Sequence, residues 1–256
     1  MDSFKTLLID NSNPGLFTIT LNRPKALNAL NEEMIDELYR VTTYLKSTNE
    51  YKAVILRGAG RAFCSGGDLR SFENIYDKGK EVIEQFISKF LRFSKTWYEL
   101  PIPTIACLRG AVAGGGASLA LASDIRIASD TTSIQFIFSK IGLIPDMGAH
   151  YLLPKIIGEA KAMELLYFGN QITADEAFKI GLVNKVVEDT HIETEVLNYA
   201  AQFNQTSTTS NKIIKRLVKQ SSQSSIDQTL NDETFYQTEC FKTDEFQGYI
   251  KSFFNK

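Results

Sequence analysis

Short apolar runs that end in glycine recur along this chain, and they alternate with segments whose apolar residues have helical spacing. Residues 53–56 lead to Gly58, and residues 104–108 lead to Gly110. An apolar run of this length that stops at a turn residue is typical of a strand buried on both faces, as in a sheet covered by helices. The helical pattern of residues 82–100 lies between the two runs. Strands that alternate with helices in this way predict an α/β fold.

The N-terminal region fits the same architecture. Residues 7–9 and 16–21 flank the turn-forming tract 11–15, which predicts a strand, a turn and a second strand. Apolar residues then recur at intervals of three and four over residues 30–45, and Asn31 is placed to cap the helix. Further along we expect a strand at 124–128 and helices from 117, at 160–168, 173–180, 193–203, 210–220 and 226–241.

Composition excludes several classes of protein. Hydrophobic residues make up 43% of the 256 residues and charged residues 23%, as in globular proteins, and the net charge is -2. A chain without excess positive charge is not expected to bind nucleic acid. Cys64, Cys107 and Cys240 lack the close pairing of zinc sites, so we expect reduced thiols. The N-terminal apolar stretch is too short for a signal peptide or a membrane span, which predicts a cytoplasmic location and no membrane association.

Two glycine-rich tracts, 58–69 and 110–117, each follow an expected strand. Glycine lets backbone amides approach a ligand closely. The spacing does not fit a nucleotide site: no lysine follows a glycine pair, and the third glycine of a dinucleotide motif would fall on Leu119. Each tract taken alone is explained by a tight turn. Together they predict two backbone amides that converge on one oxygen atom.

A serine hydrolase is the main alternative from the residues themselves. The tract 116–120 is most of a nucleophile-elbow motif around Ser118, and Asp146 and His150 follow in the hydrolase order. The final glycine of the motif is missing, and the small residues around Ser118 indicate a packed helix. His150 and His191 show no metal-ligand spacing, so no metal site is expected.

Several linked motifs in order resemble the crotonase superfamily, also called the enoyl-CoA hydratase/isomerase family. The matching segments cover essentially the whole chain, at residues 19–30, 62–69, 114–119, 142–148 and 172–183. The resemblance implies a spiral of repeated strand-strand-helix units over residues 1–190. It also implies a C-terminal helical segment, 191–256, that builds a homotrimer or a dimer of trimers.

The resemblance further implies an acyl-CoA thioester as ligand, with coenzyme A arriving as part of the substrate and with no metal or redox cofactor. The amides of Gly67 and Gly115 would bind the thioester oxygen and stabilise an enolate. Coenzyme A contacts carried over from the family fall on Lys25, Ala26, Leu27, Ala62, Ser65, Gly66, Asp68 and Leu69. Lys256 would reach the coenzyme A of a neighbouring subunit, unless it is simply a frayed terminal residue.

The chain departs from the hydratases of this family at their two glutamates. The first position is Ser118, and the second falls on or near Phe138, which we place at the substrate. Adding water needs one group to activate water and another to protonate carbon, so this loss argues against a hydratase. A carboxylate stands instead at Asp146, in a tract similar to the isomerase branch. Its alternative role is that of a first-turn helix residue after Pro145.

These features predict an acyl-CoA isomerase that shifts the double bond of 3-enoyl-CoA to 2-enoyl-CoA, with Asp146 as the proton shuttle. One alternative is a hydratase that uses Ser118 or an ordered water. Another is a 1,2-epoxyphenylacetyl-CoA isomerase, since Phe136 and Phe138 suit an aryl group as well as a fatty acyl chain. A non-catalytic acyl-CoA-binding protein and an aryl-CoA dehalogenase with Asp146 as nucleophile are the remaining alternatives.

Overall fold

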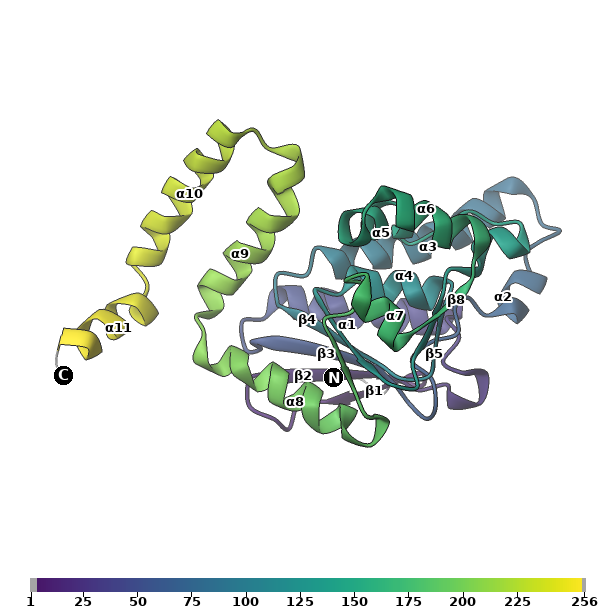
Figure 1. The fold of residues 1–256 in the computed structure, drawn as a ribbon, viewed down its shortest axis with the longest axis horizontal. Helices are drawn as coiled ribbons and strands as arrows, with labels where there is room; N and C mark the ends of the chain where they lie inside the picture. Colours follow the sequence, from purple (N-terminus) through teal and green to yellow (C-terminus); the bar gives the residue numbers. More distant parts are fainter. Residues whose placement is uncertain (1–3, 255–256) are drawn as a thin grey trace.

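A computed structural model describes residues 4–254 and contains two β-sheets (Figure 1). The larger sheet has six strands in the order β1 (Leu7–Asp10), β2 (Leu16–Leu21), β3 (Ala53–Gly58), β4 (Thr104–Leu108), β6 (Ile125–Ser129) and β9 (Lys185–Val187). Only the β1–β2 pair in this sheet is antiparallel. The smaller sheet contains β5 (Ala111–Ala113), β7 (Ser133–Gln135) and β8 (Gln171–Thr173). The predicted hairpin and the buried parallel strands are confirmed.

The helices largely follow the predicted pattern. They are α1 (Glu32–Ser47), α2 (Leu69–Glu73), α3 (Lys80–Tyr98), α4 (Gly115–Ala122), α5 (Ala149–Ile157), α6 (Glu159–Phe168), α7 (Ala174–Lys179), α8 (Ile192–Ala201), α9 (Thr208–Gln220), α10 (Ile226–Phe241) and α11 (Asp244–Phe254). The Asn31 side chain accepts a hydrogen bond from the Met34 amide at 3.0 Å, so the predicted cap of α1 is confirmed. No helix within residues 4–254 has the length and apolarity needed to cross a bilayer.

The core consists of two apolar layers on opposite faces of the larger sheet. Successive residues of a strand point to opposite faces. Val54 of β3 therefore belongs to the layer beneath α1, α3 and α4, whereas Ile55 packs against α8. Ile192 and Val196 are the α8 residues in this second layer. Burial on both faces explains why β3 and β4 are continuously apolar in sequence.

The chain winds as a spiral in which each turn contributes to both sheets. β4 lies in the larger sheet, β5 in the smaller sheet, and α4 follows them. The turn after β3 repeats this path with single β-bridges: Cys64 pairs with Val112 of β5, and Gly67 pairs with Leu30. These bridges extend the smaller sheet toward the N-terminal part of the chain. The predicted spiral of strand-strand-helix units is confirmed.

The C-terminal helices divide into two groups. α8 packs on the larger sheet, whereas α9, α10 and α11 extend away from it (Figure 1). The Nζ atoms of Lys215 and Lys219 on α9 lie 2.5 and 3.2 Å from the Asp124 carboxylate, beside β6. This ion cluster ties α9 to the body of the molecule. The division of the chain at residue 190 remains a prediction.

Several elements differ from the sequence-based expectation. The helix expected from residue 117 begins two residues earlier, at Gly115. The short elements α2, β5, β7, β8 and β9 have no predicted counterpart, because three to five residues are too few to show a period. α11 has no predicted counterpart either, and a helix after Pro145 was expected only in the alternative role of Asp146. All three strands of the smaller sheet are among the missed elements.

Candidate functional site

The first glycine tract approaches the second closely enough to exclude side chains. A Cβ atom added to Gly116 would lie 2.4 Å from the Cys64 backbone oxygen and 2.8 Å from its Sγ atom. Gly66 has φ +106°, a conformation that favours glycine, and a Cβ there would lie 2.9 Å from the Ala113 oxygen. The two tracts are further joined by hydrogen bonds between the backbones of Cys64 and residues 111–113. These glycines are therefore required for close backbone packing.

Two backbone amides are left free where the tracts meet. The Leu30 amide donates to the Gly66 oxygen and the Asp68 amide donates to the Leu30 oxygen, so the N–H of Gly67 points away from Leu30. Gly115 is the first residue of α4, and a helix leaves its first amides without internal acceptors. Within residues 4–254, neither amide has a hydrogen-bond acceptor.

The two amides also lie close together. A Cβ atom built on Gly115 would be 3.8 Å from the Gly67 nitrogen. The N-terminus of α4 adds a positive dipole end at the same place. Two free amides at a helix N-terminus can bind a negatively charged oxygen. The geometry brings together the pair of glycines that the sequence predicted.

The segments predicted to bind coenzyme A lie next to each other. The Ser65 amide donates to the Leu27 oxygen at 3.0 Å, and its hydroxyl donates to the Ala26 oxygen at 3.4 Å. Lys25, in the 3-10 turn Pro24–Ala26, is exposed, and Leu69 is 69% exposed at the start of α2. The structure therefore places two separate sequence tracts at one surface.

Asp68 has a different environment from the one that a direct ligand needs. Its carboxylate caps α2 by accepting from the Arg70 amide at 3.0 Å, and it pairs with Arg23 at 2.7 Å. The Asp68 carboxylate is therefore already bound within the protein and is not available to coenzyme A. Ala62 is buried, so its side chain cannot contact a ligand from the solvent.

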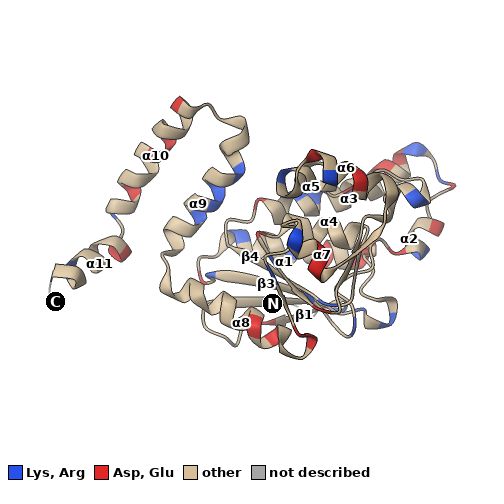
Figure 2. Ribbon diagram, in the orientation of Figure 1, with Lys and Arg blue, Asp and Glu red and all other residues tan. Residues whose placement is uncertain are grey.

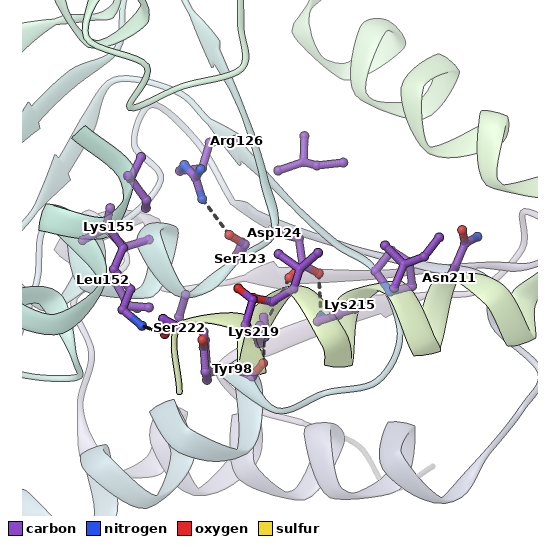
Figure 3. A pocket seen from close by; sticks show the side chains of 18 of the residues that line it. Tyr98, Ser123, Asp124, Arg126, Leu152, Lys155, Asn211, Lys215, Lys219 and Ser222 are labelled. Atoms are coloured by element: carbon purple, nitrogen blue, oxygen red, sulfur yellow. Dashed lines mark hydrogen bonds and ion pairs between the residues drawn. The ribbon is translucent and has the colours of Figure 1, made fainter. Parts of the chain in front are cut away.

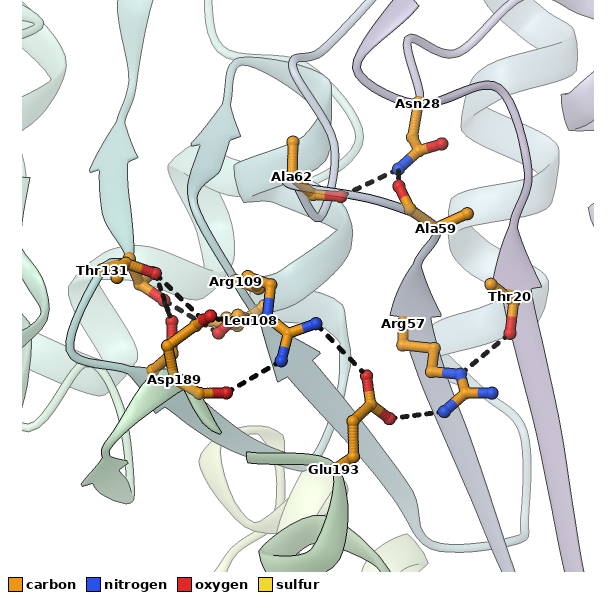
Figure 4. A network of polar contacts seen from close by, with 12 residues as sticks. Thr20, Asn28, Arg57, Ala59, Ala62, Leu108, Arg109, Thr131, Asp189 and Glu193 are labelled. Carbon is orange, nitrogen blue, oxygen red and sulfur yellow. Dashed lines mark hydrogen bonds and ion pairs between the residues drawn. The ribbon is translucent and has the colours of Figure 1, made fainter. Parts of the chain in front are cut away.

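Asn28 organises this surface, and sequence reasoning missed it. It is fully buried and has φ +56°, a region that asparagine tolerates better than most residues. Its Nδ2 atom donates to the Ala59 and Ala62 oxygens at 2.9 and 2.8 Å, as Figure 4 shows. Its Oδ1 atom accepts from the Arg23 amide at 2.9 Å. Asn28 thus fixes the loop of the predicted coenzyme A contacts to the first glycine tract.

An ionic network holds the ends of the neighbouring strands (Figure 4). Arg57 at the end of β3 pairs with Glu193 of α8. Arg109, just after β4, lies 2.8 Å from the Asp189 carboxylate and 3.7 Å from that of Glu193. The strand ends that lead into both glycine tracts are therefore anchored to the start of α8.

Asp146 has an unusual environment for a carboxylate. Its Oδ1 atom is buried, and it has no hydrogen-bond partner within residues 4–254. Burial raises the pKa of the Asp146 carboxyl to about 6, although its own backbone amide acts in the opposite direction. An unpartnered buried carboxylate with a raised pKa is suited to accept a proton.

Asp146 does not belong to the first turn of a helix. It lies in irregular chain, and α5 begins only at Ala149, with Gly148 as its cap. The alternative of a carboxylate stabilised as a first-turn residue is therefore wrong. Because no helix begins at Asp146, burial is the main influence on the pKa of its carboxyl.

The residue after Asp146 connects the carboxylate to the glycine pair. A Cβ atom on Gly115 would lie 3.5 Å from the Met147 sulfur, so this side chain borders Gly115. Met147 has φ +49°, an uncommon backbone conformation for methionine. The buried Ser94 hydroxyl of α3 donates to the Met147 oxygen at 2.7 Å. Ser94 therefore holds this strained segment, and the sequence contained no signal for the contact.

Ser118 and Phe138 are the residues that the family resemblance aligns with the two glutamates. Ser118 is fully buried on α4, and its hydroxyl donates to the Gly114 oxygen at 3.3 Å. Phe138 is 3% exposed in the 3-10 turn Ile137–Ile141.

The hydrolase alternative needs Ser118 in an exposed elbow with a histidine beside it. Ser118 is instead buried in a helix, which disfavours the hydrolase. His150 is exposed, and its ring lies 3.2 Å from the Pro145 oxygen. Lys256 lies outside the described residues.

Acidic and basic residues are distributed along the chain, with basic residues on α9 (Figure 2). A cavity of about 630 Å³ lies between α9 and the body (Figure 3). Its walls include Asp124, Lys215 and Lys219, and none of the predicted site residues lines it. Burial lowers the pKa of Lys215 to about 8, while Asp124 acts to raise it. This cavity belongs to the attachment of α9.

Known proteins provide a comparison for this geometry. A sequence model described as "Enoyl-CoA hydratase/isomerase" matches residues 11–256. A 1,2-epoxyphenylacetyl-CoA isomerase of Escherichia coli is 33% identical over 94% of this chain and 93% of its own length. A probable enoyl-CoA hydratase of Rhodobacter capsulatus is 38% identical over 70% of this chain and 68% of its own.

Solved structures show the same likeness in three dimensions. A putative enoyl-CoA hydratase of Streptomyces coelicolor has a TM-score of 0.95 at 29% identity, covering 100% of this chain and 93% of that one. An enoyl-CoA hydratase of Bacillus anthracis has a TM-score of 0.92 at 28% identity, covering 98% and 96%. The spiral fold and the sequence matches agree, and this chain belongs to the enoyl-CoA hydratase/isomerase family of the crotonase superfamily.

Proposed function

We propose that this enzyme isomerises 3-enoyl-CoA to 2-enoyl-CoA with Asp146 as its single proton shuttle. The observation that carries the proposal is the buried, unpartnered Oδ1 atom of Asp146, next in sequence to the residue that borders Gly115. A base in this environment has no competing partner for a proton. The free amides of Gly67 and Gly115 can donate hydrogen bonds to the thioester oxygen, where negative charge develops after the proton is removed.

The reaction needs only these groups. Asp146 removes a proton from the carbon next to the thioester, and the electron pair moves onto the thioester oxygen to give a dienolate. The two amides stabilise that oxygen. Asp146 then returns the proton to the γ carbon, the electron pair on the thioester oxygen re-forms the carbonyl, and the double bond lies between the α and β carbons. Atoms and charge balance without a cofactor, and the carboxylate ends as it began.

The pKa of Asp146 suits this role. A carboxyl with a pKa of about 6 is mostly ionised at neutral pH, and it is a stronger base than an ordinary aspartate. A general base works best when its pKa lies near the working pH. The same burial that raises the pKa also removes water that would compete for the proton.

The hydratase alternative has weaker support. The hydroxyl of Ser118 is engaged with the Gly114 oxygen, and Phe138 offers no acid or base. Neither side chain replaces a glutamate in activating water. Several relatives are named enoyl-CoA hydratases, so the experiment that tests this proposal must also measure hydration.

A 1,2-epoxyphenylacetyl-CoA isomerase is the second candidate. The relative of that name is 33% identical over 94% of this chain. Phe136 and Phe138 are both buried, and the Phe138 backbone oxygen accepts from the Leu143 amide at 2.9 Å, which is compatible with an aryl substrate near this segment. This candidate keeps the glycine pair as the oxyanion site and changes only the acyl group.

The test separates the products of 3-enoyl-CoA, 2-enoyl-CoA and epoxyphenylacetyl-CoA by liquid chromatography and identifies them by mass spectrometry, for wild type and Asp146→Asn, so that isomers of equal mass are resolved by retention time. Isomerisation leaves the mass unchanged, whereas hydration adds one water. We expect isomerisation of 3-enoyl-CoA that falls by about 100-fold or more in the variant. Hydration of 2-enoyl-CoA at equal rates in both proteins would overturn the proposal. Acyl-CoA binding without any turnover would favour the non-catalytic alternative.

We also propose that the C-terminal helices assemble the chain into a trimer or a dimer of trimers. α9, α10 and α11 contain no fully buried residue, yet they expose Val218, Phe235 and Phe253 by 67%, 62% and 61%. Large apolar side chains exposed in this number are typical of an interface. Light scattering at several protein concentrations tests this assembly, and a monomer throughout would contradict it.

A further inference from the structure

The ring of Phe72 lies directly against the glycine that would bind the thioester oxygen. A Cβ atom added to Gly67 would be 2.5 Å from Phe72 Cζ, with the neighbouring ring atoms at 3.1 and 3.3 Å. The ring therefore occupies the space beside the Gly67 backbone that a side chain at this position would fill. An acyl group held at the Gly67 amide lies within reach of this ring.

Phe72 is fixed at this place from both sides. It lies on α2, which begins immediately after Gly67 and its capping residue Asp68. The pairing of Asp68 with Arg23 attaches the start of α2 to the N-terminal loop. On the other side, the Phe72 ring meets Phe86 of α3 edge to face, with centroids 5.9 Å apart at 80°.

The aromatic cluster continues into the core. Phe86 and Phe90 are both buried, and their ring centroids are 4.8 Å apart. Phe72, in contrast, is only partly buried. Phe72 thus forms the accessible end of a cluster whose other members are packed in place. Displacing it would break its contact with Phe86.

We propose that Phe72 determines the acyl specificity of the site, by admitting short or planar aryl acyl groups and excluding long saturated chains. The inference rests on the proposed binding of the thioester at Gly67. A flat ring can pack edge to face against Phe72, which is the geometry that aromatic pairs prefer. A long flexible chain needs the volume that the Phe72 ring occupies.

Binding measurements test this inference without relying on turnover. Isothermal titration calorimetry with butanoyl-CoA, dodecanoyl-CoA and phenylacetyl-CoA compares wild type with Phe72→Ala and Phe72→Leu. We expect wild type to bind phenylacetyl-CoA and butanoyl-CoA more tightly than dodecanoyl-CoA. Phe72→Ala should bind dodecanoyl-CoA about tenfold more tightly and phenylacetyl-CoA about fivefold more weakly.

Two further variants separate the causes. Phe72→Leu keeps most of the side-chain volume and loses the aromatic ring. It should therefore bind phenylacetyl-CoA more weakly than wild type does, while its affinity for dodecanoyl-CoA stays low. Tyr76→Ala is the matched control, because Tyr76 follows α2 and is 75% exposed. It should leave all three affinities unchanged. Thermal unfolding of each variant checks that the fold is retained.

The inference is overturned if Phe72→Ala leaves the order of the three affinities as in wild type. It is also overturned if the Tyr76→Ala control shifts them equally. Failure of the proposed isomerisation has a different signature. In that case Asp146→Asn turns over substrate like wild type, while the affinities still respond to Phe72.

Discussion

The two glycine tracts and the Asp146 segment contribute to the same site by opposite physical means. In the glycine tracts the backbone amides are the functional groups, and steric contact excludes side chains at positions such as Gly116. In the segment 142–148 the essential feature is one carboxylate on irregular chain, and Ser94 holds the neighbouring residue by a side-chain hydrogen bond. The first region tolerates no added atom at Gly116, whereas the second depends on a few polar contacts.

This difference separates stability from chemistry. Adding atoms at Gly66 or Gly116 should affect folding first, because backbone packs against backbone at these two positions. Changing Asp146 should affect the reaction while relieving the protein of a buried charge. Substitutions in the two regions should therefore change the free energy of unfolding in opposite directions and by different amounts.

The largest effect is expected for Gly116→Ala. The new methyl group would meet the Cys64 backbone oxygen at 2.4 Å, and backbone cannot move aside easily. We expect the free energy of unfolding to fall by about 3 kcal/mol or more. Gly248→Ala in α11 is the matched control, since a Cβ there meets nothing within 4 Å. It should stabilise the protein by about 0.5–1 kcal/mol. Denaturation at one fixed protein concentration compares the two, and equal midpoints would contradict the steric account.

Asp146→Asn should change stability in the opposite direction, in a pH-dependent way. The pKa of the carboxyl rises from its usual 3.8 to about 6 on folding, so the folded chain binds the proton more tightly than the unfolded chain. The stability of wild type therefore falls as pH rises from about 4 to about 6, and the loss is complete above that range. The neutral variant avoids this loss. It should exceed wild type by up to about 3 kcal/mol at pH 8 and match it below pH 4. A constant difference across pH would contradict the buried charge.

Gly115→Ala should spare folding and impair the reaction. A methyl group there makes ordinary contacts of 3.5 Å with Leu30 and Met147, but it lies 3.8 Å from the Gly67 nitrogen. It therefore intrudes where the thioester oxygen would bind. The backbone N–H is kept, but the methyl group would displace the oxygen from the two amides. We expect kcat/KM to fall by about 100-fold, as much as when one oxyanion donor is lost, with a melting temperature close to wild type. Unchanged kcat/KM in the folded variant would show that this amide pair is not the oxyanion site.

The smallest effect is expected for Ser94→Ala. Removing the hydrogen bond to the Met147 oxygen loosens the segment that carries Asp146. We expect kcat to fall by about tenfold with little change in KM, because the base is misplaced while binding is retained. Ser94→Thr keeps the hydroxyl and should restore most of kcat. Equal losses in both variants would indicate a packing effect instead.

The features that sequence could predict are those fixed locally. The apolar runs that became β3 and β4 and the Asn31 cap follow from short-range patterns. The convergence of the two glycine tracts was visible in their residue type, whereas the choice of Gly67 and Gly115 came from the family resemblance. The contact of Ser65 with Leu27 likewise joins two tracts that carried recognisable motifs.

The remaining features depend on contacts between distant residues. Ser94 and Met147 are 53 positions apart, and nothing local marks either as a partner of the other. Phe72 is one of 17 phenylalanines, and only the folded chain places its ring on Gly67. The pKa of Asp146 depended on whether burial or a helix dipole prevailed, and this was decided by α5 starting three residues later.

The most direct test of the account is the exchange of the acyl α-protons with deuterated water, followed by NMR. A 3-enoyl-CoA ester would be incubated with wild type and with Asp146→Asn between pH 5 and 8. The account predicts exchange in wild type that rises with pH through about 6, as the carboxylate ionises, and falls by about 100-fold in the variant. Equal exchange in both proteins, with no dependence on pH near 6, would contradict a single-carboxylate proton shuttle.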